Sequence, residues 1–441
     1  MTGELVILLM TGLLIFGLTI GHPLAFVLGG TAVITAFVAG RPQAFGLIVN
    51  RLYGDVLTNY TLIAIPLFIL MARFLTDSGV TDKLFSTLQV LMSRVSGGLA
   101  LAVVVIAILL AATTGIVGAS ITVIGLMALK PMINAGYSNS VSCGIIAASG
   151  CLGILIPPSI MLVLMASYSP LSVGQLFAGA LVPGLILGIL YILFIVFLSW
   201  LRPDLVPPTK IQTEYTNQQL IKLLLIEALP PILLIVVVIG SLILGVATAT
   251  EASALGAIIA LVLVVMRGKF SLKLLQSALA ETGLTTAMIL FIVIGATAFT
   301  GVFNITGGLA ASQNLVRGLN MEPWQLIFVI MAFVFVLGMF LDWTGIVLLS
   351  FPIFLPIVNE LNIDLLWFVI LMSVVLQTSF LSPPFGYALF YLRAIAPKEV
   401  ATTQIIIGVL PYIAIIIFVC LVIAVFPSLV NWLPQKIYGL T

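Results

Sequence analysis

Residues 153–159 read Gly-Ile-Leu-Ile-Pro-Pro-Ser and set two adjacent prolines inside a strongly apolar run. A proline has no N–H to donate and displaces the carbonyl one turn earlier, so an apolar helix is expected to break there. The pattern returns at 379–385 as Ser-Phe-Leu-Ser-Pro-Pro-Phe. These two stretches predict a pair of broken helices whose interruptions uncover main-chain polar groups.

The composition around the breaks is that of a membrane protein. Of the 441 residues, 62% are hydrophobic and 7% are charged, whereas a soluble domain carries about 25% charged residues. Apolar runs such as 176–198, 223–246 and 405–426 reach the length of about 20 residues that crosses a bilayer. The sequence therefore predicts an all-α polytopic membrane protein. The net charge of +2 argues against a nucleic-acid partner.

The chain contains a weak internal repeat. Pro157 and Pro383 lie 226 residues apart, and Pro131 and Pro356 lie 225 apart. The polar stretch 201–221 separates the two copies. We therefore divide the chain into a first repeat (1–200), a cytoplasmic linker (201–221) and a second repeat (222–441).

Each repeat is predicted to contain the same series of segments. Three apolar helices open it, at 4–20, 24–40 and 61–76 in the first repeat and at 223–246, 250–266 and 284–304 in the second. A re-entrant hairpin with turn residues at its centre (97–130; 325–358), the broken helix (138–168; 365–396) and a closing helix (175–200; 402–430) follow. Each repeat then crosses the membrane five times. Because five is an odd number of crossings, the second repeat is inverted relative to the first in the membrane. This is the inverted-repeat pattern of secondary transporters.

The distribution of basic residues supports this count of crossings. With the N-terminus outside, eleven lysines and arginines fall on one face, and Arg41, Arg51, Arg317 and Lys436 fall on the other. Because cytoplasmic loops carry the excess of basic residues, the first face is expected to be cytoplasmic. Both termini are then expected to be periplasmic.

The hairpin tips and the breaks form the candidate transport site, because non-helical backbone inside a membrane needs protein or a water-filled cavity around it. Freed carbonyls and side-chain oxygens suit a hard cation such as Na⁺, and the N-termini of half-helices suit a carboxylate. The candidate sodium ligands are Thr113, Thr114, Gly115, Gly118, Ser120, Gly153, Pro157, Gly338, Asp342, Thr344, Gly345 and Ser382. The candidate substrate contacts are Ser149, Pro158, Ser159, Thr378, Ser379, Pro383 and Pro384.

Simpler interpretations stand beside these assignments. The prolines and glycines could serve only to kink helices for packing. Asp342 is an ionisable residue in an apolar stretch, and it is either a sodium ligand or a capping residue at the hairpin tip. Glu251 is interpreted as an N-terminal cap, and Arg73 and Asp77 as an ion pair one helical turn apart.

The sequence shows no constellation typical of an enzyme. It has no Gly-x-Ser-x-Gly elbow, no His/Cys metal spacing and no Walker loop. We therefore expect a protein that is not an enzyme and whose transport is driven by an ion gradient rather than by its own ATP hydrolysis.

The motifs resemble those of a known family. Gly150-Cys-Leu-Gly-Ile-Leu-Ile-Pro-Pro-Ser159, His22-Pro-Leu-Ala-Phe26 and Ile65-Pro-Leu-Phe68 resemble the large membrane subunit of tripartite ATP-independent periplasmic (TRAP) transporters. The resemblance implies an elevator-type transporter of the bacterial inner membrane that couples Na⁺ to uptake of an organic acid, such as a dicarboxylate, a 2-oxo acid or a sugar acid. It also implies a small four-helix membrane subunit and a periplasmic substrate-binding protein. Ile116 and Val117 depart from the family's first hairpin tip, where two serines are usual.

Two other classes remain open at this point. A stand-alone Na⁺/dicarboxylate symporter of the same elevator design would need no binding protein. A channel-type pore or a structural membrane subunit would use the broken helices as a static path. The identity of the acid, the number of Na⁺ ions and the oligomeric state do not follow from the sequence.

Overall fold

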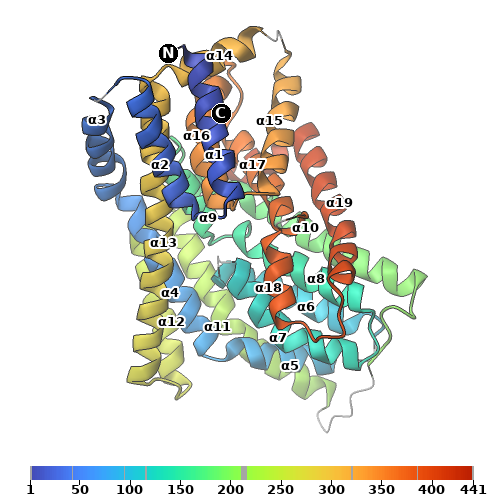
Figure 1. Cartoon of the computed structure of the whole chain (residues 1–441). Coiled ribbons are helices and arrows are strands. Elements are labelled where there is room, and N and C mark those ends of the chain that lie inside the picture. Colours follow the sequence, from blue (N-terminus) through green and yellow to red (C-terminus); the bar gives the residue numbers. More distant parts are fainter. Residues whose placement is uncertain are drawn as a thin grey trace.

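The computed structural model describes residues 2–41, 43–93, 95–114, 117–209, 216–318, 321–384 and 386–439, without the side chains of 111–114 and 217. Over these residues the regular structure is entirely helical (Figure 1). Eight helices in the described part are long and apolar enough to cross a membrane. The predicted all-α polytopic class is therefore confirmed.

The first half runs from the N-terminus to the end of its longest helix. Its helices are α1 (Gly3–Thr19), α2 (Leu24–Val38), α3 (Gln43–Arg51), α4 (Ala64–Asp77), α5 (Val80–Leu91), α6 (Gly98–Thr114), α7 (Val117–Asn134), α8 (Asn139–Cys151), α9 (Ile160–Ser167) and α10 (Val173–Leu201). A π-helical segment (Leu52–Leu57) and a 3-10 turn (Tyr60–Ile63) precede α4, and a second 3-10 turn (Leu152–Ile154) follows α8.

The second half contains the remaining helices. They are α11 (Asn217–Ile243), α12 (Ala249–Met266), α13 (Leu272–Ile305), α14 (Gly308–Gly318), α15 (Pro323–Gly338), α16 (Trp343–Glu360), α17 (Leu365–Leu381), α18 (Tyr387–Ile395), α19 (Thr402–Val425) and α20 (Ser428–Tyr438).

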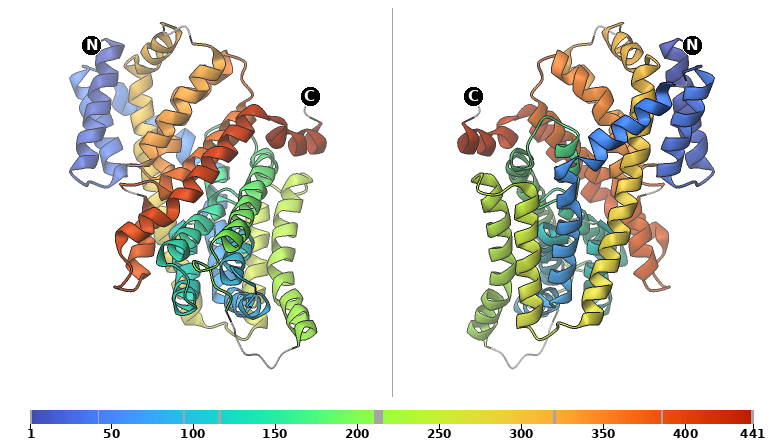
Figure 2. Two further views of the ribbon diagram at one scale, coloured as in Figure 1. Left: turned by 90° about the vertical axis from the view of Figure 1, so that its right-hand side faces the viewer. Right: turned by 90° about the vertical axis from the view of Figure 1, so that its left-hand side faces the viewer.

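Helix contacts of the first half have counterparts in the second. α2 packs against α13 and α12 packs against α4, while α1 contacts α14 and α11 contacts α5. α6 packs against α7 and α8, as α15 packs against α16 and α17. Figure 1 shows α1, α2 and α14 at the end of the molecule that carries both termini, and α5, α11 and α12 at the opposite end. Figure 2 shows the same separation from two further sides.

Two helix boundaries differ markedly from the predicted ones, and two helices were not predicted as separate elements. α13 begins at Leu272, not at 284, because Ser271 caps it and its extra turns continue to pack on the bundle. The closing helix predicted at 402–430 ends at Val425, where Phe426 leaves the helical conformation before Pro427. α20 is a separate helix, and the amphipathic helix α3 was not predicted at all.

Charged residues at helix ends behave as the sequence predicts. Thr248 and Glu251 cap α12 reciprocally: the Glu251 N–H donates to the Thr248 hydroxyl at 3.3 Å, and the Thr248 N–H donates to the Glu251 carboxylate at 2.8 Å. Arg73 Nε lies 3.0 Å from Asp77 Oδ2 within α4. The same guanidinium reaches Glu281 of α13 at 2.8 Å, so this pair also ties two helices together.

A close helix contact joins the two halves. A Cβ atom added to Gly144 of α8 would lie 2.0 Å from the carbonyl oxygen of Gly408 in α19, and one added to Gly408 would lie 2.0 Å from the carbonyl oxygen of Ser140. Only glycine permits this approach of the two backbones, as is common where membrane helices pack. The contact fixes the first broken helix against the last long helix of the chain.

Candidate transport site

The first break lies between α8 and α9, and residues 152–159 are all buried. Ser159 is the N-cap of α9: its hydroxyl oxygen accepts a hydrogen bond from the Leu162 N–H at 3.4 Å. The same hydroxyl donates to the Ile154 carbonyl across the break. Pro157 and Pro158 lie inside the loop that Ser159 closes, and Gly153 lies in the preceding turn. The break is thus a compact structure buried within the protein.

The second break, between α17 and α18, is more open. The Ser382 hydroxyl donates to the Thr378 carbonyl at 2.8 Å, and the Thr378 hydroxyl donates to the Val375 carbonyl at 2.6 Å. Pro383 is half-buried and Pro384 is exposed. Hydroxyls that donate their protons in this way keep oxygen lone pairs that can bind a cation.

The tip of the second hairpin lies between α15 and α16. Asp342 is the N-cap of α16, and its Oδ1 accepts a hydrogen bond from the Thr344 N–H at 2.9 Å. The capping role considered for this residue is therefore present. A Cβ atom added to Gly345 would lie 2.3 Å from Leu24 Cδ2, so the first turn of α16 packs closely on the start of α2.

This hairpin also touches the second broken helix. A Cβ atom added to Gly338, at the end of α15, would lie 1.8 Å from the Ser379 hydroxyl oxygen in α17. Ser379 is buried, and its hydroxyl has no hydrogen-bond partner among the described residues. Two predicted site residues are thereby brought into direct contact.

The tip of the first hairpin is only partly described. Thr113 and Thr114 end α6, but their side chains and all of Gly115 lie outside the described residues. Gly118 lies in the first turn of α7, where an added Cβ atom would lie 2.5 Å from the Tyr391 ring of α18. Ser120, one turn into α7, is buried. The first hairpin therefore contacts the half-helix that follows the second break.

Two buried polar side chains near the breaks have no hydrogen-bond partner among the described residues. Ser149 of α8 was predicted, but Gln377 of α17 was missed. Gln377 is fully buried, and neither its amide nitrogen nor its amide oxygen has a partner in the described part of the chain. A buried amide without partners is costly. Its position within an apolar helix, six residues before the Pro-Pro pair, was the signal that could have identified it.

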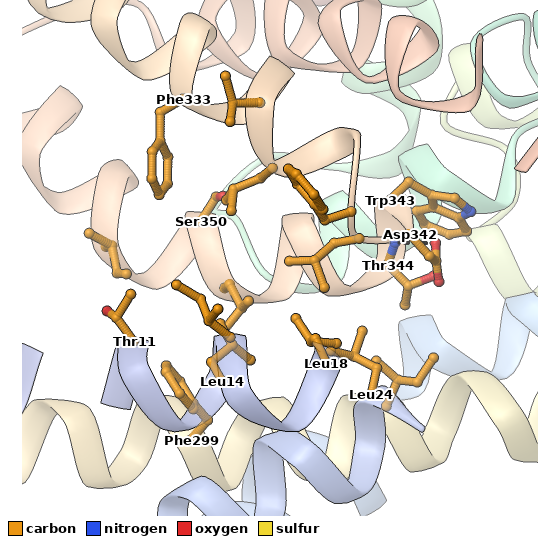
Figure 3. A pocket seen from close by; sticks show the side chains of 18 of the residues that line it. Thr11, Leu14, Leu18, Leu24, Phe299, Phe333, Asp342, Trp343, Thr344 and Ser350 are labelled. Atoms are coloured by element: carbon orange, nitrogen blue, oxygen red, sulfur yellow. Dashed lines mark hydrogen bonds between the residues drawn. The ribbon is translucent and has the colours of Figure 1, made fainter. Parts of the chain in front are cut away.

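A cavity of about 1560 Å³ lies beside the second hairpin. One wall comes from α1, the start of α2 and α13, and the other from α15 and α16. Asp342, Trp343 and Thr344 gather at one end of it, whereas Leu14, Leu18, Phe299 and Phe333 line its length (Figure 3). Gly118, Tyr387 and Tyr391 also line the cavity. The sequence did not predict that α1, α13 and these two tyrosines contribute to it.

The charges around this cavity are few. Among the described lining residues there is no lysine or arginine, and Asp342 is the only acidic one. No group of three or more His, Cys, Asp or Glu side chains that could hold a metal ion occurs in the described ranges. The oxygen donors at the breaks and tips are carbonyls, hydroxyls and one carboxylate. This donor set fits a hard cation better than a metal that prefers nitrogen or sulfur ligands.

Comparison with known proteins agrees with a transport role. Residues 9–429 match the model of the tripartite ATP-independent periplasmic transporter, DctM component. The chain is 32% identical to the C4-dicarboxylate TRAP transporter large permease protein DctM of Pseudomonas aeruginosa over 85% of this chain and 87% of that protein. It is 27% identical to the sialic acid TRAP transporter large permease protein SiaM of Vibrio cholerae over 97% of both chains.

A solved structure shares the fold. The YdaH transporter of Alcanivorax borkumensis superimposes with a TM-score of 0.63 at 14% sequence identity, covering 88% of this chain and 89% of that one. These relatives are transporters and permeases, not enzymes. The family model covers nearly the whole chain. This protein therefore belongs to the tripartite ATP-independent periplasmic transporter family, as a DctM component.

Proposed function

We propose that this chain is the large permease of a Na⁺-coupled, binding-protein-dependent importer of an organic acid in the bacterial inner membrane. The observation that carries the proposal is that the second broken helix contacts both hairpins: Ser379 meets Gly338 of the second hairpin, and Tyr391 meets Gly118 of the first. Relatives named for C4-dicarboxylate and sialic acid transport support an organic acid as the substrate class.

The proposed mechanism is an elevator built on an inverted repeat. The paired helix contacts support two copies of one unit (1–200 and 222–441), and the position of α1 and α2 opposite α11 and α12 supports their inversion. The moving part comprises the hairpins and broken helices, and α1, α2, α4 and α11–α13 form the scaffold. The apolar wall that α1 and α13 present to the cavity supports this division, because sliding along it breaks no hydrogen bonds.

The Na⁺ ion is assigned to the freed backbone at the breaks and tips. Ser382 and Thr378 offer hydroxyl oxygens next to the second break, and Asp342 supplies one negative charge nearby in the same half. A bound Na⁺ would offset that charge and allow an anionic substrate to approach. Substrate binding and ion binding would then be coupled through electrostatics.

The experiment that tests this function is uptake into liposomes. The chain is reconstituted with the small four-helix membrane subunit and the periplasmic binding protein that we propose as its partners. Uptake of radiolabelled organic acids is measured with and without an inward Na⁺ gradient. We expect uptake only with the Na⁺ gradient and only with both partners present.

The competing functions predict other results. Uptake by the chain alone would favour a stand-alone symporter. Flux that is insensitive to Na⁺ and does not saturate would favour a channel-type pore. Substitution of Pro157 by alanine is expected to reduce uptake, because it removes one of the two prolines that keep the chain out of a continuous helix at the first break. Undiminished uptake by this variant, confirmed as folded, would contradict the assignment of the break.

A further inference from the structure

The tyrosines of α18 occupy a position that the proposed function does not yet use. Tyr387 and Tyr391 are one helical turn apart, so both side chains lie on the same face of α18. Both line the cavity, and they are 37% and 44% exposed. Within the described residues, no hydrogen bond is made by either phenol hydroxyl. Two accessible donors therefore face the cavity without a partner.

These tyrosines connect the two hairpins. The Tyr391 ring packs against Gly118 of the first hairpin, where it leaves no room for a Cβ atom. Asp342 of the second hairpin lines the same cavity as Tyr387. A ligand held by both hydroxyls would thus contact α18 between the two hairpins. In the proposed mechanism this is the part of the molecule that moves with its substrate.

The chemistry of the cavity restricts the ligand. The described lining residues include no lysine or arginine and one histidine, His22, so a carboxylate is held there mainly by neutral donors and by a bound cation. A second carboxylate on the same molecule would meet no lysine or arginine in the described lining, at a high desolvation cost. Most of the lining is apolar, with residues such as Leu14, Leu18 and Phe333 and only a few serines and threonines, so most hydroxyls of a sugar acid would lose hydrogen bonds to water without replacement.

We propose that Tyr387 and Tyr391 donate hydrogen bonds to the single carboxylate of a substrate whose apolar body lies along the cavity. The substrate class is thus a monocarboxylate with an apolar body, not a dicarboxylate or a sugar acid. This inference rests on the proposed function, in that it assigns the acid to the same transport site. Asp342 lines the same cavity as the tyrosines, so Na⁺ would lie between its carboxylate and that of the substrate.

Direct binding to the full-length chain tests the inference without the other subunits. The chain is placed in lipid nanodiscs in NaCl, and binding is followed by the fluorescence of Trp343, which lines the cavity. A Trp343→Phe variant identifies its share of the signal from the five tryptophans. The probes are phenylacetate, its uncharged analogue phenylacetamide, succinate and N-acetylneuraminate.

The expected result is saturable binding of phenylacetate and none of the other three. Tyr387→Phe and Tyr391→Phe should each weaken it about tenfold, the effect of losing one hydrogen bond to a charged group. Tyr412→Phe is the matched control, because its hydroxyl is buried in α19 away from the cavity. That variant should bind like the wild type.

The outcomes separate this inference from the proposed function. Binding of succinate or N-acetylneuraminate in preference to phenylacetate would overturn the substrate class but leave an organic-acid permease in place. Binding of phenylacetate with equal affinity in both tyrosine variants would overturn the role of the hydroxyls. If no carboxylate binds, the inference fails here, and the proposed function is then judged by the uptake experiment.

Discussion

At the scale of single residues, the same side chains serve structure and are proposed to serve transport. Asp342 caps α16 through Thr344, and Ser159 closes the first break while capping α9. A capping side chain holds an oxygen atom in a fixed position. That oxygen accepts a hydrogen bond from a backbone N–H that has no acceptor within the helix. A substitution at such a residue is therefore expected to change both the stability and the ion binding. The two effects must be measured in variants that change only one of them.

Asp342 allows that separation. Asp342→Asn keeps a capping oxygen but loses the charge, whereas Asp342→Ala loses both. We expect the asparagine variant to unfold at nearly the wild-type temperature and the alanine variant to lose about 1 kcal/mol of stability, the usual cost of a missing cap. Thermal unfolding in detergent measures this difference.

The same two variants test the ion site. If Asp342 supplies the charge that Na⁺ offsets, both should lose most Na⁺-dependent uptake, whatever their stability. Uptake that falls only in the alanine variant would mean that the carboxylate acts as a cap alone. Ser312→Ala provides a control at a residue that also lines the cavity but lies on α14, away from the tip.

At the scale of helices, the positions of the breaks follow from local sequence, but their surroundings do not. The proline pairs at 157–158 and 383–384 end helices wherever the chain folds. The helix-capping groups of α12 were likewise readable from four consecutive residues, 248–251. In contrast, Tyr391 meets Gly118 from more than 250 residues away, and only the packed bundle brings them together. Gln377 was missed because a lone polar residue in an apolar helix does not reveal its neighbours.

The contact between α8 and α19 gives a prediction at this scale. Gly144→Ala should separate the two helices, because the new methyl group would lie 2.0 Å from a backbone oxygen that cannot move away. We expect a loss of about 1–3 kcal/mol and a lower unfolding temperature. Gly240→Ala in α11 is the matched control, since an added Cβ atom meets nothing there within 4 Å.

That control should be neutral or slightly stabilising, because alanine favours a helix by about 1 kcal/mol over glycine. Thermal unfolding of both variants in the same detergent measures the difference. Equal unfolding temperatures for Gly144→Ala and the wild type would show that the two helices do not touch in the membrane.

At the scale of the whole molecule, the sequence predicted the class and the order of segments but not the cavity. Composition determines that most surfaces face lipid, and the matched prolines identify corresponding points of the two halves. The cavity depends on how α1 and α13 face α15 and α16, which are separated along the chain and carry no motif. In sequence, the apolar helix faces that line the cavity look like helix faces that contact lipid, so the cavity could not be predicted from them.

The orientation of the molecule gives the last prediction. The chain termini lie at one end of the structure, and the α12–α13 connection lies at the other (Figure 1). The excess of basic residues near the second end predicts that this end faces the cytoplasm. We therefore expect a cysteine at Lys436, in α20, to face the periplasm and one at Lys273, at the start of α13, to face the cytoplasm. Both lysines are exposed.

Labelling of intact spheroplasts with a membrane-impermeant maleimide distinguishes the two ends. Lys436→Cys should react before lysis, and Lys273→Cys only after it. The unmodified chain is the control, because Cys143 and Cys151 are buried and Cys420 is half-buried in α19, so little labelling is expected from the native thiols. The reverse order of labelling would show that the molecule has the opposite orientation. The end that carries the termini and the cavity would then face the cytoplasm. A periplasmic binding protein would have no access to the cavity from that end.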